Sequence, residues 1–137
     1  MSAIKLIIFD LDGVLVEAKN IHFDALNEAL STINPGYKIG WSEHLNTYDG
    51  LKTYQKLELL TKEKGLPVEA HKDIWNKKQQ ITLSKLSNLE PDDNLIATMQ
   101  LLYKNGFKLA VCSNSIRKTV LTVLAKLGLI EYLDLII

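Results

Sequence analysis

Two aspartates, two residues apart, follow an apolar segment near the start of the chain. Residues 4–9 are apolar apart from one lysine and predict a buried strand, after which come Asp10, Asp12 and Gly13. Side chains at positions i and i+2 of an extended segment point the same way, so both carboxylates are expected on one side of the strand end. Because the two charges repel, the pattern favours a divalent cation between them, or a division into a nucleophile and an acid/base. The alternative is a hairpin that turns at Asp12 and Gly13, with residues 14–16 as its return strand.

A second group of polar residues follows a second apolar segment. Residues 107–112 predict a strand, and Ser113, Asn114 and Ser115 stand at the start of the helix expected after it. Free backbone N–H groups at a helix start attract anions, and a serine hydroxyl adds a donor. Because ligands gather at the carboxyl ends of parallel strands, this segment is expected to face the two aspartates. The alternative is plain N-capping of the helix by Asn114 or Ser115.

The single cysteine raises the alternative of a cysteine phosphatase. Such enzymes have five residues between the catalytic cysteine and an arginine, whereas only four separate Cys112 from Arg117. In addition, no histidine directly precedes Cys112. Cys112 also fits the apolar pattern of its strand, so the sequence favours a buried structural thiol. One cysteine excludes an internal disulfide and is typical of a cytoplasmic protein in a reducing cytosol.

Size and charge exclude several classes of function. A chain of 137 residues, 47% hydrophobic and 23% charged, is expected to form one modest domain or a small core with an insertion. The 16 basic and 16 acidic residues leave no net charge, which gives no support to nucleic acid as a partner. Arg117 is the only arginine, so bidentate arginine clamps on a phosphate are almost excluded. No apolar stretch approaches the length of about 18 residues that a membrane span needs.

The predicted elements follow the order strand, block of helices, then helix, strand, helix and strand. This order indicates an α/β fold, a parallel sheet core with a helical insertion after the first strand. Residues 1–16 and 88–137 would form the core and residues 17–87 the insertion, with Trp41 and Trp75 packed in the interior of the insertion. Helices are predicted at residues 16–30, 41–46, 51–64, 69–86, 92–104 and 115–127, and strands at 4–9, 107–112 and 132–137.

Both polar segments resemble motifs of one family. Asp10-Leu11-Asp12-Gly13-Val14-Leu15 resembles the first motif of the haloacid dehalogenase-like (HAD) superfamily of phosphotransferases, and residues 110–115 resemble its second motif. The resemblance implies a Rossmann-like core with a helical cap. It implies that Asp10 attacks phosphorus and forms an aspartyl-phosphate, while Asp12 protonates the leaving oxygen and later activates water. Ser113 would hold the phosphate, and Asn114 would help through its backbone amide.

The resemblance extends to four residues of the predicted cap. In relatives resembling β-phosphoglucomutase, a histidine at the spacing of His22 contacts the acid/base aspartate. Lys78 and Gln79 resemble a cap lysine–asparagine pair that reaches the substrate, and Lys52 lies where relatives keep a specificity loop. Ala18 stands where those relatives commonly carry a hydroxyl residue, which weakens the match to the mutases. The alternatives are a partly exposed histidine of no special role, a solvated basic helix face and a commonplace loop lysine.

Two elements that the resemblance implies are missing. The family carries a neutralising lysine and an acidic magnesium ligand after the third strand, and the sequence stops at Ile137 before either; Lys118 and Lys126 follow the second motif too closely. Mg²⁺ prefers oxygen ligands, of which the Asp10 side chain and the Asp12 carbonyl would supply two, so weak metal binding is expected. We therefore expect a fragment of a longer phosphatase, with an exposed third-strand edge.

Three functions stay open. The first is a Mg²⁺-dependent, phosphatase-type hydrolase that acts on a small phosphomonoester, such as a sugar phosphate. The second is a β-phosphoglucomutase-like phosphotransferase. The third is a catalytically incomplete HAD-like domain that binds a partner, for example in a dimer through the exposed edge of the third strand. The expected ligand is a small phosphorylated metabolite, and neither nucleic acid nor a membrane is expected as a partner.

Overall fold

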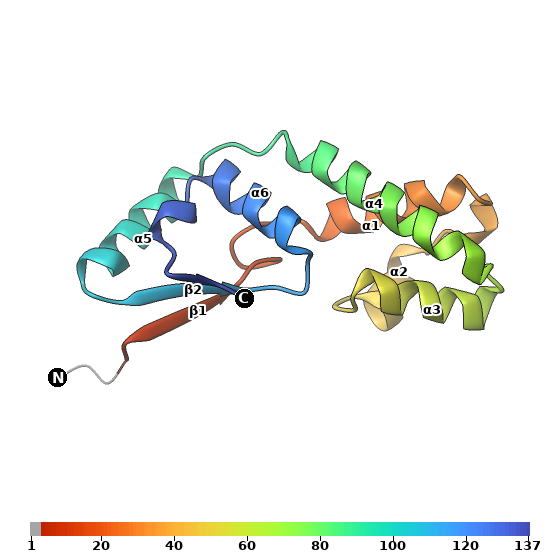
Figure 1. The fold of residues 1–137 in the computed structure, drawn as a ribbon, viewed down its shortest axis with the longest axis horizontal. Helices are drawn as coiled ribbons and strands as arrows, with labels where there is room; N and C mark the ends of the chain where they lie inside the picture. Colours follow the sequence, from red (N-terminus) through yellow and green to blue (C-terminus); the bar gives the residue numbers. More distant parts are fainter. Residues whose placement is uncertain (1–3) are drawn as a thin grey trace. The chain divides into compact units, whose positions relative to one another are not determined.

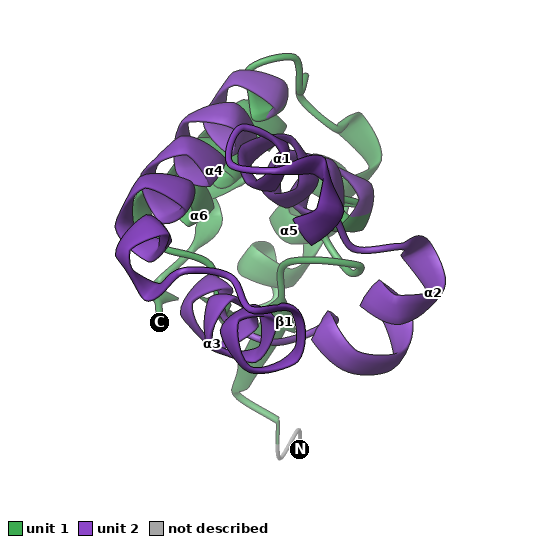
Figure 2. Ribbon diagram, turned by 90° about the vertical axis from the view of Figure 1, so that its right-hand side faces the viewer, with its two compact units in different colours: residues 1–19, 86–137 green, residues 20–85 purple. Residues whose placement is uncertain are grey.

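The computed structural model describes residues 4–137, and the chain divides into two compact units (Figure 2). Unit 1 consists of the chain up to Lys19 together with Leu86–Ile137. Unit 2 is Asn20–Lys85, so the chain leaves and re-enters unit 1 once each. None of the helices in the described range combines the length and the apolar character needed to cross a bilayer.

A three-stranded parallel sheet is the centre of unit 1 (Figure 1). Its strands are β1 (Leu6–Asp10), β2 (Lys108–Cys112) and β3 (Leu135–Ile136), in the spatial order β1-β2-β3. The last residues of β1 and β2 are register partners, so both strands end at the same edge of the sheet. The predicted α/β class, with a parallel Rossmann-like sheet interrupted by a helical insertion, is confirmed.

Two amphipathic helices pack on one side of this sheet (Figure 1). The Asp92 carboxylate accepts hydrogen bonds from two amides in the first turn of α5 (Asp93–Lys104). α6 (Arg117–Leu127) ends at Gly128, whose positive φ of 77° supplies the left-handed C-cap. Residues from both helices and the sheet form the buried interior, among them Met99, Leu109, Val111, Val120, Val123 and Leu124.

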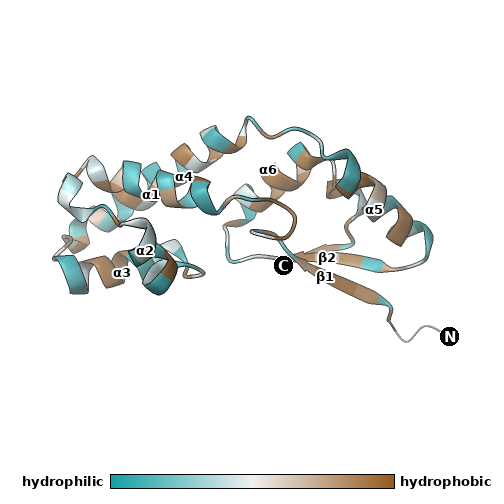
Figure 3. Ribbon diagram, turned by 180° about the vertical axis from the view of Figure 1, so that it is seen from behind, coloured by the Kyte–Doolittle hydropathy of each residue, from teal (hydrophilic) through white to brown (hydrophobic). Residues whose placement is uncertain are grey.

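On the other side of the sheet the two outer strands are exposed, which contradicts the prediction that the first strand is buried. Leu6 and Ile8 of β1 are 50% and 54% exposed, and Leu135 of β3 is 54% exposed. β1 appears as an apolar strand at one edge of the sheet in Figure 3. Within unit 1, α5 and α6 cover one face only, and a strand that is apolar on both faces is therefore half exposed.

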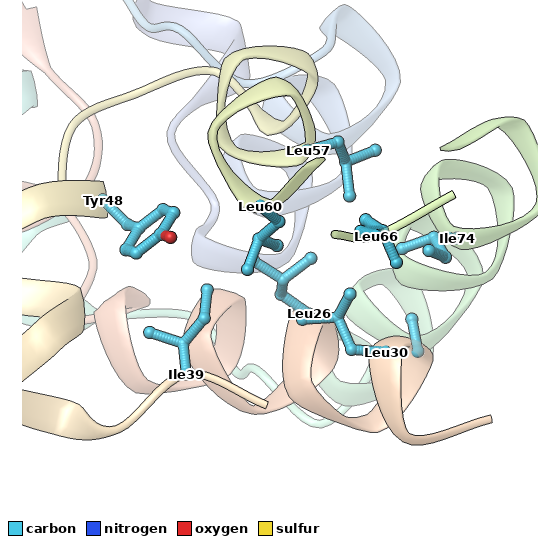
Figure 4. Close-up of a cluster of buried hydrophobic side chains, with 9 residues drawn as sticks. Leu26, Leu30, Ile39, Tyr48, Leu57, Leu60, Leu66 and Ile74 are labelled. Atoms are coloured by element: carbon cyan, nitrogen blue, oxygen red, sulfur yellow. The ribbon is translucent and has the colours of Figure 1, made fainter. Parts of the chain in front are cut away.

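Unit 2 is built around four α-helices. The structure describes all of its residues, 20–85, and none of them forms a strand. The four helices are α1 (Lys19–Ser31), α2 (Trp41–Glu43), α3 (Thr53–Lys64) and α4 (His71–Leu86), the first and last of which join unit 1. A π-helical segment, His44–Tyr48, follows α2. The helices enclose a hydrophobic cluster (Figure 4), formed by Leu26, Ala29, Leu30, Ile39, Tyr48, Leu57, Leu60, Leu66 and Ile74.

The two tryptophans of unit 2 differ in burial. Trp75 packs against the hydrophobic cluster, as predicted. Trp41 is 42% exposed, so its predicted place in the interior is wrong. It begins the three-residue helix α2 and meets Phe23 edge-on at a ring distance of 5.0 Å, and so short a helix covers only part of the indole.

Candidate active site

Asp10 and Asp12 lie at the end of β1 and in the turn that follows it. The backbone amide of Leu11 donates to Oδ1 of Asp10 at 2.8 Å, which orients the carboxylate. The Leu11 carbonyl then accepts from three later amides, and Gly13 takes a positive φ of 81°. These bonds close a tight turn, with a single isolated parallel bridge between Asp12 and Val16. The alternative of a β-hairpin is therefore wrong, because residues 14–16 curl back onto the turn.

The second polar segment lies between β2 and α6. The amide of Ser115 donates to Oγ of Ser113 at 3.1 Å, and Oγ of Ser115 donates to Oδ2 of Asp12 at 3.5 Å, a long hydrogen bond. The N-cap of α6 is Ile116, which makes no side-chain cap bond. Neither Asn114 nor Ser115 caps the helix, so that alternative is wrong, because α6 begins two residues later than predicted.

The geometry thus brings the two polar segments together at one edge of the sheet. Asp10 is the register partner of Cys112, the residue before Ser113. Ser115 supplies the direct side-chain contact to Asp12 across 103 positions of sequence. From the sequence, Ser115 is expected only as a capping residue, although its spacing of two from Ser113 would point both side chains the same way in an extended segment. The catalytic and binding roles of these residues stay predictions.

The exposure of Cys112 contradicts the prediction of a buried structural thiol. Cys112 is exposed, and it is the last residue of β2, beyond the three buried residues at the centre of that strand. The nearby guanidinium does not serve a thiolate: Nη1 of Arg117 donates to the carbonyl of Ile136 at 3.2 Å and ties α6 to β3. The structure gives no support to a cysteine phosphatase.

The predicted cap residues lie in unit 2. Lys78 is 5% exposed and its Nζ lies 3.4 Å from Nδ1 of His22, a contact that joins α4 to α1. Gln79 is also buried, so the alternative of a solvated basic helix face is wrong. Lys52 is exposed at the N-cap of α3, where its amide donates to Oε1 of Gln55 at 3.0 Å.

The aspartate segment offers oxygen ligands, the type of donor atom that a hard cation prefers. In residues 4–137, no three His, Cys, Asp or Glu side chains are grouped as a metal site. The carboxylate of Asp10 and the carbonyl of Asp12 are oxygen donors, which Mg²⁺ prefers, and Mg²⁺ commonly keeps several waters. These residues therefore fit part of a magnesium site.

A cavity of about 600 Å³ in unit 1 lies apart from these residues. It is formed where the chain leaves unit 1 after β1 and where it returns before α5, and four of its lining residues are acidic. None of the predicted catalytic or phosphate-binding residues lines it. Its walls are Val14, Leu15, Val16, Glu17, Leu89, Glu90, Pro91, Asp92, Asp93, Leu95 and Leu127.

Two curated relatives align with almost the whole chain. The pyrophosphatase PpaX of Halalkalibacterium halodurans is 28% identical over 134 residues, which are 98% of this chain and 59% of the relative. The phosphoglycolate phosphatase of Aquifex aeolicus is 30% identical over 134 residues, which are 97% of this chain and 60% of the relative. The chain thus spans about three fifths of the length of these relatives.

Solved structures share the fold. A variant of CbbY from Rhodobacter sphaeroides in complex with xylulose-(1,5)bisphosphate superimposes with a TM-score of 0.83 over 97% of this chain and 62% of that protein. At 18% identity this likeness shows the fold alone. The family model of haloacid dehalogenase-like hydrolases matches residues 7–137, which include both polar segments. The chain therefore belongs to the haloacid dehalogenase-like hydrolase family.

Proposed function

We propose that the protein is a phosphatase-type hydrolase that cleaves a small phosphomonoester, such as a sugar phosphate, through an aspartyl-phosphate. The family and the phosphatase names of two relatives support this reaction class. The observation that carries the proposal is the contact of Ser115 with Asp12, which joins the aspartate segment to the serine segment. Carboxylates and hydroxyl donors are thereby gathered at the carboxyl edge of a parallel sheet, where ligands bind in such folds.

The proposed reaction has two steps. Oδ1 of Asp10 is held by the Leu11 amide, which leaves the second carboxylate oxygen to attack phosphorus. The bond from phosphorus to the leaving oxygen breaks, and protonated Asp12 gives its proton to that oxygen. Water then attacks the aspartyl-phosphate and gives a proton back to Asp12. The P–O bond to Asp10 breaks, inorganic phosphate leaves, and both carboxyl groups return to their starting states.

Binding of the phosphoryl group falls to hydroxyl and amide donors. Arg117 is the only arginine and donates to a carbonyl of β3, so no guanidinium is assigned to the phosphate. We assign this role to the Ser113 hydroxyl and the Asn114 backbone amide. The Asp10 carboxylate and the Asp12 carbonyl would hold Mg²⁺, which when bound offsets the negative charge on phosphate and carboxylates.

Substitution of the nucleophile tests this proposal. With p-nitrophenyl phosphate and Mg²⁺, Asp10→Asn is expected to lower kcat by about a thousandfold or more, since no other group is proposed to form the aspartyl-phosphate. Acid quenching should trap a phosphorylated wild-type protein and no phosphorylated Asp10→Asn protein. Asp24→Asn, which changes an exposed carboxylate on α1, is the matched control. Unchanged activity in Asp10→Asn would overturn the proposal.

The contact of Lys78 with His22 favours a second candidate, a β-phosphoglucomutase-like phosphotransferase. Both residues occupy positions that resemble cap residues of the mutases, and they lie 3.4 Å apart. Such an enzyme would interconvert sugar phosphates only when a sugar bisphosphate primes it, whereas a phosphatase would release phosphate without a primer. Product analysis with and without the bisphosphate separates these two reactions.

The exposed face of the sheet favours a candidate of a different class, a binding domain. Leu6, Ile8 and Leu135 share one face and are each half exposed or more. A dimer through the edge of β3 would pair the unpaired backbone groups of that edge and join the apolar faces of two sheets into one surface. Analytical ultracentrifugation of the chain and of Leu135→Lys would decide, since a dimer that depends on this edge should dissociate in the variant.

A further inference from the structure

The cavity of about 600 Å³ has an apolar inner wall, and every residue that lines it belongs to unit 1. On this wall Leu15 and Leu127 are each 5% exposed and Val16 is 9% exposed. The amides of Leu15 and Val16 donate to the Leu11 carbonyl at 3.0 Å and 3.1 Å, so the turn after β1 holds this part of the wall in place. Pockets that bind small molecules are mostly apolar and have volumes of about 300–1,000 Å³. The cavity therefore has the size and the inner surface of a small-molecule site.

Four carboxylates line the same cavity, and no basic residue does. They are Glu17, Glu90, Asp92 and Asp93. Among residues 4–137, no lysine, arginine or histidine forms an ion pair with any of them. The whole chain has no net charge, so this excess of negative charge is local. A concave surface with apolar walls and charges of one sign concentrates their field and attracts ions of the opposite sign. The cavity therefore favours a cationic ligand.

The start of α5 accounts for only two of the four carboxylates. Asp92 caps the helix with Oδ1, which accepts from both amides, and its Oδ2 accepts from none of the described residues. Asp93 lies in the first turn, where the positive end of the helix dipole stabilises a negative charge. Glu17 and Glu90 lie outside any helix, so neither capping nor the helix dipole explains their place in the lining.

The arrangement of these side chains does not suit a metal ion. In the described part of the chain, no three His, Cys, Asp or Glu side chains lie close enough together to hold one. A metal ion takes oxygen ligands and makes no use of an apolar wall. A linear polyamine fits both features, because methylene segments separate its ammonium groups. The methylenes contact an apolar surface while each ammonium donates to a different carboxylate.

We propose that this cavity binds a linear aliphatic polyamine. Its ammonium groups donate to Glu17, to Glu90 and to Oδ2 of Asp92. The methylene segments between them lie against Leu15 and Leu127. Glu17 comes shortly before the chain leaves unit 1 and Glu90 shortly after it re-enters, so the bound polyamine links these two segments of unit 1. The site uses none of the residues of the proposed reaction and stands independently of the proposed function.

Isothermal titration calorimetry of the 137-residue chain with spermidine tests the proposal. We expect saturable binding at physiological salt. Glu17→Gln and Glu90→Gln change exposed side chains, and each should weaken binding about threefold and the double variant about tenfold, because each removes one partly exposed ion pair. Glu131→Gln changes an exposed carboxylate of unit 1 outside the cavity and should bind as the wild type does. Wild-type affinity in the double variant, or no saturable binding to the wild type, would overturn the proposal.

NMR locates the bound spermidine and separates it from other ligands. The methyl resonances of Val14 and Leu95, which line the cavity, should shift during the titration, whereas those of Leu57 in unit 2 should not. Mg²⁺ at equal concentration should not displace spermidine. Dilysine amide, a peptide of similar charge, should bind more weakly, because its backbone interrupts the methylene chain. Displacement by Mg²⁺, tighter binding of the peptide, or shifts confined to residues outside the cavity would each contradict the proposed site.

Discussion

The Nζ atom of Lys78 lies 3.4 Å from Nδ1 of His22, although the two residues are 56 positions apart in the sequence. An ammonium group has only donors, so it can bond Nδ1 only when that nitrogen carries no proton. The neutral imidazole must then hold its proton on Nε2. The contact therefore selects one tautomer of His22 and makes its other nitrogen a hydrogen-bond donor.

Removal of the Lys78 charge should release this tautomer. Nitrogen-15 NMR of the wild type is expected to show His22 with its proton on Nε2, and Lys78→Met should show a mixture of both neutral tautomers. Lys77→Met removes the neighbouring exposed lysine and should behave as the wild type. The same single tautomer in Lys78→Met would show that another group holds the ring.

Ser115→Ala tests the contact with Asp12. Loss of the hydroxyl removes a hydrogen bond to a carboxylate, and we expect kcat/KM for the phosphomonoester to fall about tenfold, which corresponds to about 1.4 kcal/mol. Ser115→Thr keeps the hydroxyl and should restore most of the activity. If the threonine variant is as impaired as the alanine variant, the contact at 3.5 Å does not contribute to the reaction.

Two glycines with similar φ angles allow the cost of backbone strain to be measured separately from the cost of a steric clash. Gly106 and Gly128 have φ of 84° and 77°, but only at Gly128 would a Cβ atom meet another group closely, Cδ1 of Ile96 at 2.9 Å. Alanine should cost about 1 kcal/mol at Gly106 through backbone strain. At Gly128 it should cost a little more, because Cδ1 at the flexible end of the Ile96 side chain must also move aside. Urea denaturation measures both variants, and equal losses would contradict the collision.

Tyr48 should make stability fall at high pH. Burial raises the pKa of its phenol well above the ordinary value, and the hydrogen bond to Glu63 and the negative charges of Glu63 and Glu43 add to this. An unfolded chain loses this proton near pH 10 and the folded chain does not, so the stabilisation is complete below about pH 10 and declines above it. Tyr48→Phe should flatten the decline between pH 10 and 11.5 in thermal unfolding. Tyr54→Phe, which changes an exposed tyrosine, should leave it unchanged.

Local sequence determined the elements and their ends. Runs of apolar residues located the three strands, and the helical period of apolar residues located the six helices, to within about three residues at each end. Asp92 before α5, Gly65 after α3 and Gly128 after α6 mark helix ends by their own backbone chemistry. The aspartate motif that resembles the family is likewise a continuous segment, Asp10–Leu15, so the sequence alone is enough to identify it.

Tertiary structure decided which residues meet and which are covered. The contacts of Ser115 with Asp12 and of Lys78 with His22 join positions far apart in sequence, so no local period could predict them. Burial of Lys78 and exposure of Cys112 both reverse what their residue types suggested. Periodicity describes a single element, whereas burial depends on which other elements pack against it and on which face, and that is settled only when the whole chain folds.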